Sequence, residues 1–265
     1  MRVVVVGACG RMGREVLKAV SSDSSFELVA AVDRELTGTS CQELVGGSAP
    51  ATVLIEKKLG EALDRTKPDA IVDFTHASSA TAHALSAIMR GIAPVIGTTG
   101  LSETDIRELA SASRETGTAG IYAPNFAIGA ILMMRFAQMA AKWLPDCEII
   151  ELHHDKKEDA PSGTALLTAQ LIGDARTGSP RRKPRPIFKV EGVRGGESHD
   201  TPIHSVRLPG YVAHQEVIFG GTGEVLTIRH DSMDRVSFME GVKLCLREVR
   251  SLNGFVIGMD KILFR

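Results

Sequence analysis

The sequence predicts an α/β fold in which a doubly wound parallel sheet comes first and a second α+β domain, built on a mixed or antiparallel sheet, follows. Strand-like runs alternate with helical periods over roughly the first 124 residues, a pattern typical of a parallel sheet with helices on both faces. Between residues 187 and 230 several strand-like runs follow one another without helices. This change of pattern indicates a second domain.

The first half of the chain repeats a strand-helix-strand unit. Arg2–Val6 is a run of valines without alternation, as expected for a strand buried on both faces of a parallel sheet. Apolar residues recur at helical spacing in Arg11–Ser21, and Glu27–Val32 returns to strand character. Ser102 and Asp105 form a capping-box pattern with a shortened acid. Further strands and helices are predicted over Ala70–Phe74, Ser78–Arg90, Pro94–Ile96, Ser102–Thr116 and Gly120–Ala123.

The second half begins with a helix predicted over Ala130–Trp143. Its apolar stripe of Ile131, Met134, Met139 and Trp143 is interpreted as core packing rather than as a ligand site. Beyond it we expect a strand over Cys147–Leu152, a helix over Gly163–Ile172, an irregular basic segment over Arg176–Pro186, strands over Ile187–Val190, His204–Leu208, His214–Phe219 and Glu224–His230 with a hairpin turn at Gly220–Gly223, a helix near Val236–Arg250, and a short apolar end at Ile262–Phe264.

The composition favours a small-molecule partner. The chain has 31 basic and 32 acidic side chains and only 5% aromatic residues, so no strong field recruits nucleic acid or a membrane surface. Its four cysteines are far apart and form no Cys-x-x-Cys pair, which favours free thiols and no metal site. No signal peptide and no run of about 18 apolar residues is recognised, so a cytoplasmic protein is expected.

A glycine-rich loop between the first strand and the first helix predicts a Rossmann-like dinucleotide site. Glycines at this position permit a tight turn and let backbone amides approach a pyrophosphate at the helix N-terminus, although such a loop alone also fits a plain turn. The loop and the start of the helix comprise Gly7, Ala8, Cys9, Gly10, Arg11, Met12 and Gly13.

Asp33 and Arg34 follow the second strand and support the cofactor prediction. Asp33 lies twenty residues after Gly13, where an acid accepts hydrogen bonds from an adenosine ribose. Arg34 carries a guanidinium suited to a 2′-phosphate, so the pair indicates use of NADPH, NADH or both. A solvated charge pair at a strand end is the alternative interpretation.

Two further turns are expected at the carboxyl ends of parallel strands, where ligands bind in open α/β sheets. Phe74 and Thr75 end a neighbouring strand in the same way, whereas His76 and His83 are interpreted as solvated or packed. The small residues of the two turns leave room for a nicotinamide ring. These residues are Gly97, Thr98, Thr99, Ala123, Pro124, Asn125 and Phe126.

The stretch Glu151–Leu166, reading ELHHDKKEDAPSGTAL, contains the predicted catalytic residues. His153 and His154 follow a strand and point to opposite faces, so one handles a proton and the other binds substrate. Lys157 brings an ammonium group close in sequence to the same pocket, where it neutralises a carboxylate or donates a proton. A charged, solvated loop is the alternative for each residue taken alone. A zinc site is excluded because the spacing His-Glu-x-x-His is missing.

The same stretch ends in a predicted helix start. Ser162 is a plausible cap, and Gly163 and Thr164 leave amide donors exposed at the helix N-terminus. Such donors attract anions. A histidine, a lysine and this anion site together suit a small substrate that carries carboxylates.

Three blocks of the sequence resemble the bacterial dihydrodipicolinate reductase family. They are VVVVGACGRMGREV, GTTG with APNFA, and ELHHDKKEDAPSGTA, of which the third is specific to the family. The resemblance implies an enzyme of the diaminopimelate route to L-lysine. Such an enzyme reduces 4-hydroxy-tetrahydrodipicolinate, a small cyclic dicarboxylate, by hydride from NADPH or NADH and releases tetrahydrodipicolinate and water.

The resemblance also assigns roles and boundaries. His153 and Lys157 match catalytic positions, and the cofactor positions are those already named. His154, Gly163 and Thr164 match substrate-binding positions. Residues 1–124 with 234–265 are expected to form the dinucleotide-binding domain, and residues 125–233 the substrate-binding and oligomerisation domain of a homotetramer. Asp33 stands where the family more often has Glu, and the basic Arg181–Arg185 loop has no assigned role.

Two other functions remain open at this point. One is a different two-domain dehydrogenase, acting on a sugar or an amino-acid semialdehyde, that shares only the first domain. The other is a regulator that binds a nicotinamide dinucleotide without turning it over. The block around His153 and Lys157 argues against the first function, and the second leaves these two residues without a purpose.

Overall fold

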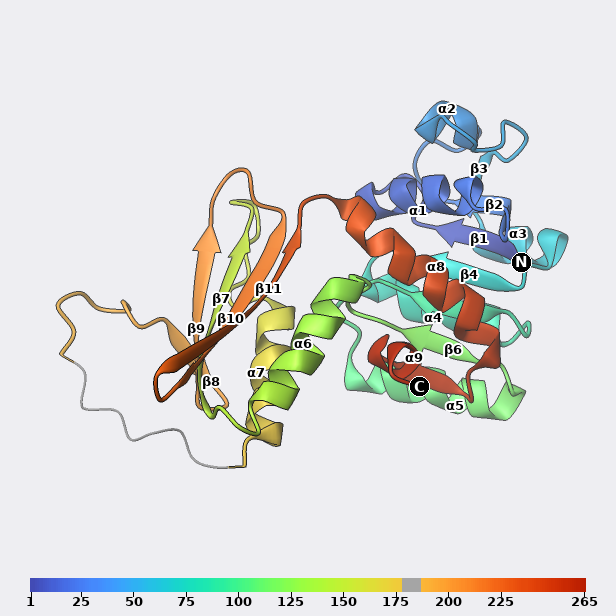
Figure 1. Cartoon of the computed structure of the whole chain (residues 1–265). Coiled ribbons are helices and arrows are strands. Elements are labelled where there is room, and N and C mark those ends of the chain that lie inside the picture. Colours follow the sequence, from blue (N-terminus) through green and yellow to red (C-terminus); the bar gives the residue numbers. More distant parts are fainter. Residues whose placement is uncertain (178–186) are drawn as a thin grey trace. The chain divides into compact units, whose positions relative to one another are not determined.

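The computed structural model describes residues 1–177 and 187–265 (Figure 1). The chain divides into two compact units. Unit 1 comprises Met1–Phe126 and Phe238–Arg265, and unit 2 comprises Ala127–Ser237. The carboxyl-terminal segment of the chain therefore belongs to unit 1, together with the amino-terminal sheet. The predicted Arg181–Arg185 loop lies outside the described residues.

Unit 1 is built on a seven-stranded sheet in the order β12-β6-β5-β4-β1-β2-β3, and every neighbouring pair is parallel. The valine run of β1 lies between two neighbouring strands, and its last four residues are at most 1% exposed. The strands are β1 (Arg2–Val6), β2 (Glu27–Val32), β3 (Ile55–Glu56), β4 (Ala70–Asp73), β5 (Ala93–Ile96), β6 (Gly120–Tyr122) and β12 (Phe255–Ile257).

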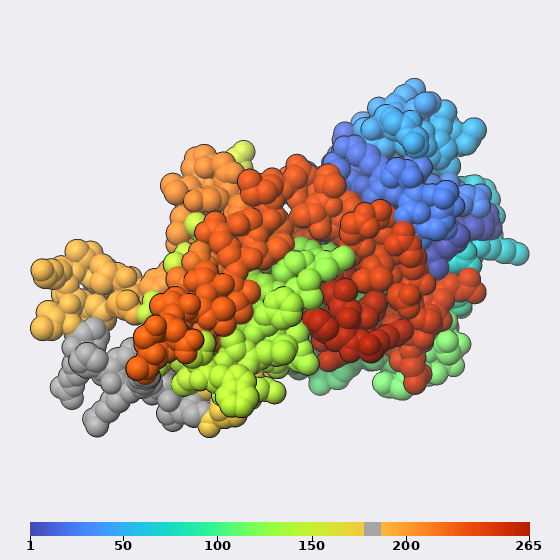
Figure 2. All heavy atoms as spheres, in the orientation of Figure 1, coloured from blue at the N-terminus to red at the C-terminus, as the bar shows by residue number. Residues whose placement is uncertain are grey.

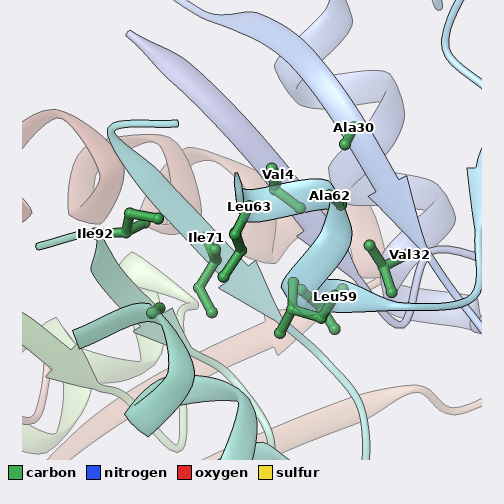
Figure 3. Packing of buried hydrophobic residues seen from close by; sticks show 10 residues of the cluster. Val4, Ala30, Val32, Leu59, Ala62, Leu63, Ile71 and Ile92 are labelled. Carbon is green, nitrogen blue, oxygen red and sulfur yellow. The ribbon is translucent and has the colours of Figure 1, made fainter. Parts of the chain in front are cut away.

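Helices cover both faces of this sheet, so its doubly wound α/β class is confirmed. Figure 3 shows one side, where apolar residues of α3 and of β1, β2 and β4 converge on a shared core. Each large aliphatic side chain buried there contributes about 1.5–3 kcal/mol. The helices of unit 1 are α1 (Arg11–Ser22), α2 (Cys41–Val45), α3 (Leu59–Thr66), α4 (Ala77–Ile88), α5 (Glu103–Thr116), α8 (Met239–Glu248) and α9 (Asp260–Leu263).

The capping box predicted for α5 is present. The Ser102 hydroxyl accepts a hydrogen bond from the Asp105 amide at 3.1 Å, and the Asp105 carboxylate accepts one from the Ser102 amide at 2.8 Å. The shorter acid therefore closes the box as a Glu would.

Unit 2 is built on a five-stranded sheet in the order β11-β10-β7-β9-β8. The pair β7 and β9 is parallel and the other pairs are antiparallel, so the predicted mixed sheet is confirmed. Helices α6 (Ile128–Ala140) and α7 (Gly163–Ala175) pack on it around a shared apolar core. The strands are β7 (Asp146–His153), β8 (Gly196–Ser198), β9 (Thr201–Arg207), β10 (Ala213–Gly221) and β11 (Glu224–Ser232).

Some local predictions are wrong. Ile187–Val190 is not a strand, and Ile187 is 92% exposed, because apolar composition does not supply a neighbouring strand to pair with. The predicted core stripe of α6 fails at its end: Met139 is 53% and Trp143 is 83% exposed. The carboxyl-terminal part of α6 reaches the surface in Figure 2.

Short elements were not recognised from the sequence. β3 and β12 each join the edge of the large sheet through two or three residues, too few for a periodic pattern to show. The predicted helix over Val236–Arg250 is α8 flanked by two 3₁₀ turns, Arg235–Phe238 and Val249–Ser251. In the described part of the chain no helix is both long and apolar enough to cross a membrane.

Candidate active site

The glycine loop of unit 1 forms a tight turn that leads directly into α1. Gly7 adopts a φ of 79°, and a Cβ on Gly13 would overlap the Gly7 carbonyl, so both positions require glycine. Gly10 is the N-cap of α1, and no side chain among the described residues caps it. The Ala8 amide binds the Val32 carbonyl at 3.2 Å, while Arg11 and Met12 open the helix. The start of α1 thus has the backbone geometry that suits an anion.

The Asp33 carboxylate is held beside this loop by hydrogen bonds from backbone amides. One carboxylate oxygen accepts the Cys9 amide at 2.8 Å, and the other accepts the Glu35 amide at 3.0 Å. Burial and the neighbouring Asp33 raise the pKa of the Cys9 thiol to about 11, so Cys9 is a neutral thiol. Arg34 is exposed next to Asp33. The carboxylate is therefore held in place by two backbone amides.

A cavity of about 430 Å³ opens between these residues. Several of the predicted cofactor residues line it, namely Gly7, Cys9, Gly10, Asp33 and Arg34. Phe74 and Thr75 line it as well, and so do Lys57, His76 and His83, which the sequence did not mark as site residues. The glycine cradle, the uncapped helix and a fixed carboxylate in one cavity fit a nicotinamide dinucleotide.

The Gly97–Thr99 turn is organised by a buried carboxylate. Asp73, which is 0% exposed, accepts hydrogen bonds from the Thr75 amide and hydroxyl and from the Thr98 hydroxyl at 2.6–3.0 Å. Its second oxygen lies 2.8 Å from Nδ1 of His83. His83 is thus a partner of a buried acid. Thr99 is exposed.

The fourth predicted cofactor segment, Ala123–Phe126, follows β6. Ala123 is buried and its amide binds the Ile96 carbonyl at 3.0 Å, whereas Pro124 is exposed and Asn125 is half-buried. The Phe126 ring lies 5.6 Å from the Phe74 ring. A Cβ on Gly97 would overlap that same Phe74 ring. The two turns are therefore packed together through Phe74.

In unit 2, His153 is the last residue of β7 and lies beside a buried acid. Its Nδ1 is 2.5 Å from an oxygen of Glu151, which is completely buried. The His153 side chain is 15% exposed. Because Nδ1 is engaged by the carboxylate, Nε2 is the nitrogen that can meet a substrate.

Arg207 on β9 binds both oxygens of Glu151, at 2.9 and 2.7 Å. The same guanidinium donates to the carbonyls of Lys157, at 3.3 Å, and Asp159, at 2.7 Å. Arg207 thereby ties the loop that carries the predicted lysine to the buried acid beneath His153.

The remaining predicted residues of unit 2 gather around this loop. The Lys157 side chain is 21% exposed, and its ammonium binds both carboxylate oxygens of Asp159 at 2.6 and 2.7 Å. His154 is half-buried and its carbonyl accepts the Lys157 amide at 3.1 Å.

Helix α7 begins as predicted, and its start is also attached to Glu151. The Ser162 hydroxyl accepts the Ala165 amide at 3.2 Å, and the Ser162 amide donates to Glu151 at 3.3 Å. Gly163 and Thr164 are the first two helical residues. A Cβ on Gly163 would meet open space, and Gly163 is exposed at this helix start.

Sequence reasoning missed Glu151 and Arg207. A signal for Glu151 was present: Cys147, Ile149 and Glu151 alternate along β7, and all three are buried. An acidic side chain on the buried face of a strand needs hydrogen-bond donors or a cation beside it. Arg207 gave no such signal, because only the parallel pairing of β7 with β9 brings it to the site.

Comparisons with known proteins agree over the whole chain. Two family models match, described as dihydrodipicolinate reductase, N-terminus, over residues 1–126 and dihydrodipicolinate reductase, C-terminus, over residues 129–263. The 4-hydroxy-tetrahydrodipicolinate reductase of Syntrophomonas wolfei is 48% identical over 262 residues, covering 99% of this chain and 98% of the relative. That of Geobacillus kaustophilus is 48% identical over 263 residues, covering 99% of each chain.

Solved structures give the same result. The dipicolinate-bound dihydrodipicolinate reductase from Paenisporosarcina sp. TG-14 superposes with a TM-score of 0.88 at 40% identity over 99% of each chain. An amine dehydrogenase from Mycobacterium smegmatis, at a TM-score of 0.70 and 13% identity over 98% of this chain and 95% of its own, shares the fold alone. The chain therefore belongs to the dihydrodipicolinate reductase family, and it is an NADH- or NADPH-dependent 4-hydroxy-tetrahydrodipicolinate reductase of the diaminopimelate route to lysine.

Proposed function

We propose that unit 2 holds the cyclic dicarboxylate and supplies a proton from His153, while unit 1 holds NADPH or NADH. The reaction consumes one hydride and one proton and releases one water. The nicotinamide supplies the hydride when it is bound. The observation that carries the proposal is the fixed Nδ1 of His153, which leaves Nε2 to transfer the proton.

Lys157 has a second role in this proposal. Its side chain is only 21% exposed and its ammonium is held by Asp159, so a positive charge is kept in the loop that follows His153. A substrate carboxylate competes with Asp159 for this ammonium. His154 and the start of α7, at Gly163 and Thr164, bind the substrate's carboxylates. Dipicolinate, which the Paenisporosarcina relative binds, is the natural probe for this pocket.

On the cofactor side, the proposal assigns the start of α1 to the pyrophosphate and Asp33 to the ribose. The residues involved are Gly7, Ala8, Cys9, Gly10, Arg11 and Met12 in the loop, Asp33 and Arg34 after β2, Gly97, Thr98 and Thr99 after β5, and Ala123, Pro124, Asn125 and Phe126 after β6. The shared cavity of about 430 Å³ supports the assignment of the first two groups.

The assignment further proposes a dinucleotide-binding domain of residues 1–124 and 234–265, a substrate-binding domain of residues 125–233, a homotetramer and a cytoplasmic location. Apolar side chains exposed on β11, Val225 at 70% and Leu226 at 39%, support assembly through the sheet of unit 2. Light scattering of the purified chain measures the assembly: a monomeric mass contradicts this part of the proposal.

The role of His153 is tested by His153→Ala in an assay that couples synthase-generated substrate to loss of nicotinamide absorbance. General acid catalysis contributes about 10²- to 10⁴-fold, so kcat falls by at least about 100-fold while the Kd for NADPH stays within about twofold. A loss of kcat below about threefold removes His153 from the proton transfer.

The role of Arg34 is tested by Arg34→Ala in the same assay, run with each cofactor. Loss of the guanidinium raises KM for NADPH more than KM for NADH, because only NADPH carries the 2′-phosphate. Equal changes in the two KM values show that Arg34 does not contact that phosphate.

A further inference from the structure

The buried acid Glu151 has no role among the residues assigned above, and its position is costly. It lies on the inward face of β7, in register with Cys147 and Ile149, which belong to the apolar core under α6 and α7. A charged carboxylate in such a layer costs several kcal/mol unless it is paired and hydrogen-bonded. A carboxylate retained there needs a reason beyond packing.

Glu151 is kept ionised by its partners. Burial alone would raise the pKa of this carboxyl, but hydrogen bonds from His153, Arg207 and Ser205 outweigh burial and lower the pKa to about 2. An ionised carboxylate only accepts hydrogen bonds. The Nδ1 of His153, 2.5 Å away, must therefore carry its hydrogen and donate it.

We infer that Glu151 is a positioning residue for the proton transfer: it accepts the Nδ1–H of His153 and orients the ring, so that Nε2 takes up a proton from solvent and passes it to the substrate. Arg207 fixes the carboxylate through both oxygens, so the orienting group cannot rotate. The inference rests on the role proposed for His153 and extends it by a second residue.

The arrangement does more than satisfy a buried charge. Arg207 alone gives Glu151 two charge-assisted hydrogen bonds, and the Ser162 amide gives a further one. Through Arg207 the same carboxylate is connected to the carbonyls of Lys157 and Asp159. A glutamine at this position keeps one oxygen that can accept from Arg207 and from the Ser162 amide, so Glu151→Gln retains the links to the loop carrying the lysine and to the start of α7 while it removes the carboxylate beside His153.

A matched control lies on the same strand. Glu148 also binds one histidine and one arginine, His204 at Nε2, 2.8 Å away, and Arg194. The Glu148 side chain is 29% exposed, and neither of these two partners is a proposed site residue. Glu148→Gln therefore removes the same kind of charge from the same strand without touching His153.

The first experiment compares Glu151→Gln, Glu151→Asp and Glu148→Gln by steady-state kinetics and by dipicolinate titration. Loss of orientation at the reacting group costs about 10- to 100-fold, so kcat of Glu151→Gln falls by that factor. Its KM for NADPH and its Kd for dipicolinate stay within about twofold. Glu151→Asp recovers part of kcat, and Glu148→Gln keeps kcat within about twofold.

The results separate this inference from the proposed function. A normal kcat in Glu151→Gln together with an impaired His153→Ala overturns the positioning role alone. A normal kcat in His153→Ala overturns the proposed function itself. A loss of dipicolinate binding in Glu151→Gln as large as its loss in kcat shows a merely structural role and also overturns the inference.

A second measurement uses the unmodified protein, so it does not depend on whether Glu151→Gln folds. Nitrogen-15 spectra of labelled histidine, assigned by the signal missing from His153→Ala, report which ring nitrogen carries the hydrogen. The expected result is a protonated Nδ1, whose nitrogen-15 signal lies upfield of the signal of an unprotonated ring nitrogen. An Nε2–H tautomer of His153 in the free enzyme overturns the inference.

Discussion

Two carboxylates on one strand, β7, have the same partners by type and different surroundings. The Glu148 side chain, paired with His204 and Arg194, is 29% exposed. The Glu151 side chain, paired with His153 and Arg207, is completely buried. Exposed ion pairs contribute at most about 1 kcal/mol, because water screens them and side-chain entropy opposes them. Burial turns the same set of side chains into a fixed unit, in which loss of one member leaves a charge unpaired.

The largest expected difference is in the free energy of unfolding when each of the two arginines is replaced. Arg207→Met leaves Glu151 buried without its cation and lowers the free energy of unfolding by about 3–5 kcal/mol. Arg194→Met, at an exposed pair, lowers it by less than about 1 kcal/mol. Urea unfolding of both variants at neutral pH measures the difference. Similar losses in the two variants contradict the distinction drawn between the clusters.

A smaller effect is expected from acid. The pKa of Glu151 is lowered from 4.5 to about 2 in the folded protein, so its contribution to stability is fully present above pH 4.5 and is lost as the pH falls towards about 2. The free energy of unfolding therefore decreases through this window, and the decrease is smaller in Glu151→Gln. Burial raises the pKa of Glu148, but the hydrogen bonds and charges of His204 and Arg194 outweigh burial and lower this pKa as well. Glu148→Gln therefore changes the acid dependence of stability in the same direction.

Urea titrations at a series of pH values distinguish the two carboxylates. Because the pKa of Glu151 falls to about 2, Glu151→Gln should flatten the curve more than Glu148→Gln does. An unchanged acid dependence in Glu151→Gln would mean that this carboxylate has no partner-dependent pKa in the folded protein.

Much of the fold followed from local pattern. The buried valine run of β1, the glycine loop and the helical period of α1 each depend on neighbours in sequence, and all lie where they were predicted. Elements that depend on distant partners were missed, such as β3 and β12, which exist because a sheet edge is available to pair with. Ile187–Val190 shows the converse, since suitable residues without a partner strand form no strand.

The residues of the candidate site differ in the same way: some were recognisable from local sequence, and others depend on distant partners. By itself the sequence determined the glycine cradle, the acid after β2, the capped start of α7 and the block that contains His153 and Lys157, because each is a run of residues close along the chain. Only the tertiary structure decided that Glu151 is buried under His153 and that Arg207, 56 residues away, holds it. The physical reason is that a buried charge depends on its surroundings, and those are assembled by strand pairing between distant segments.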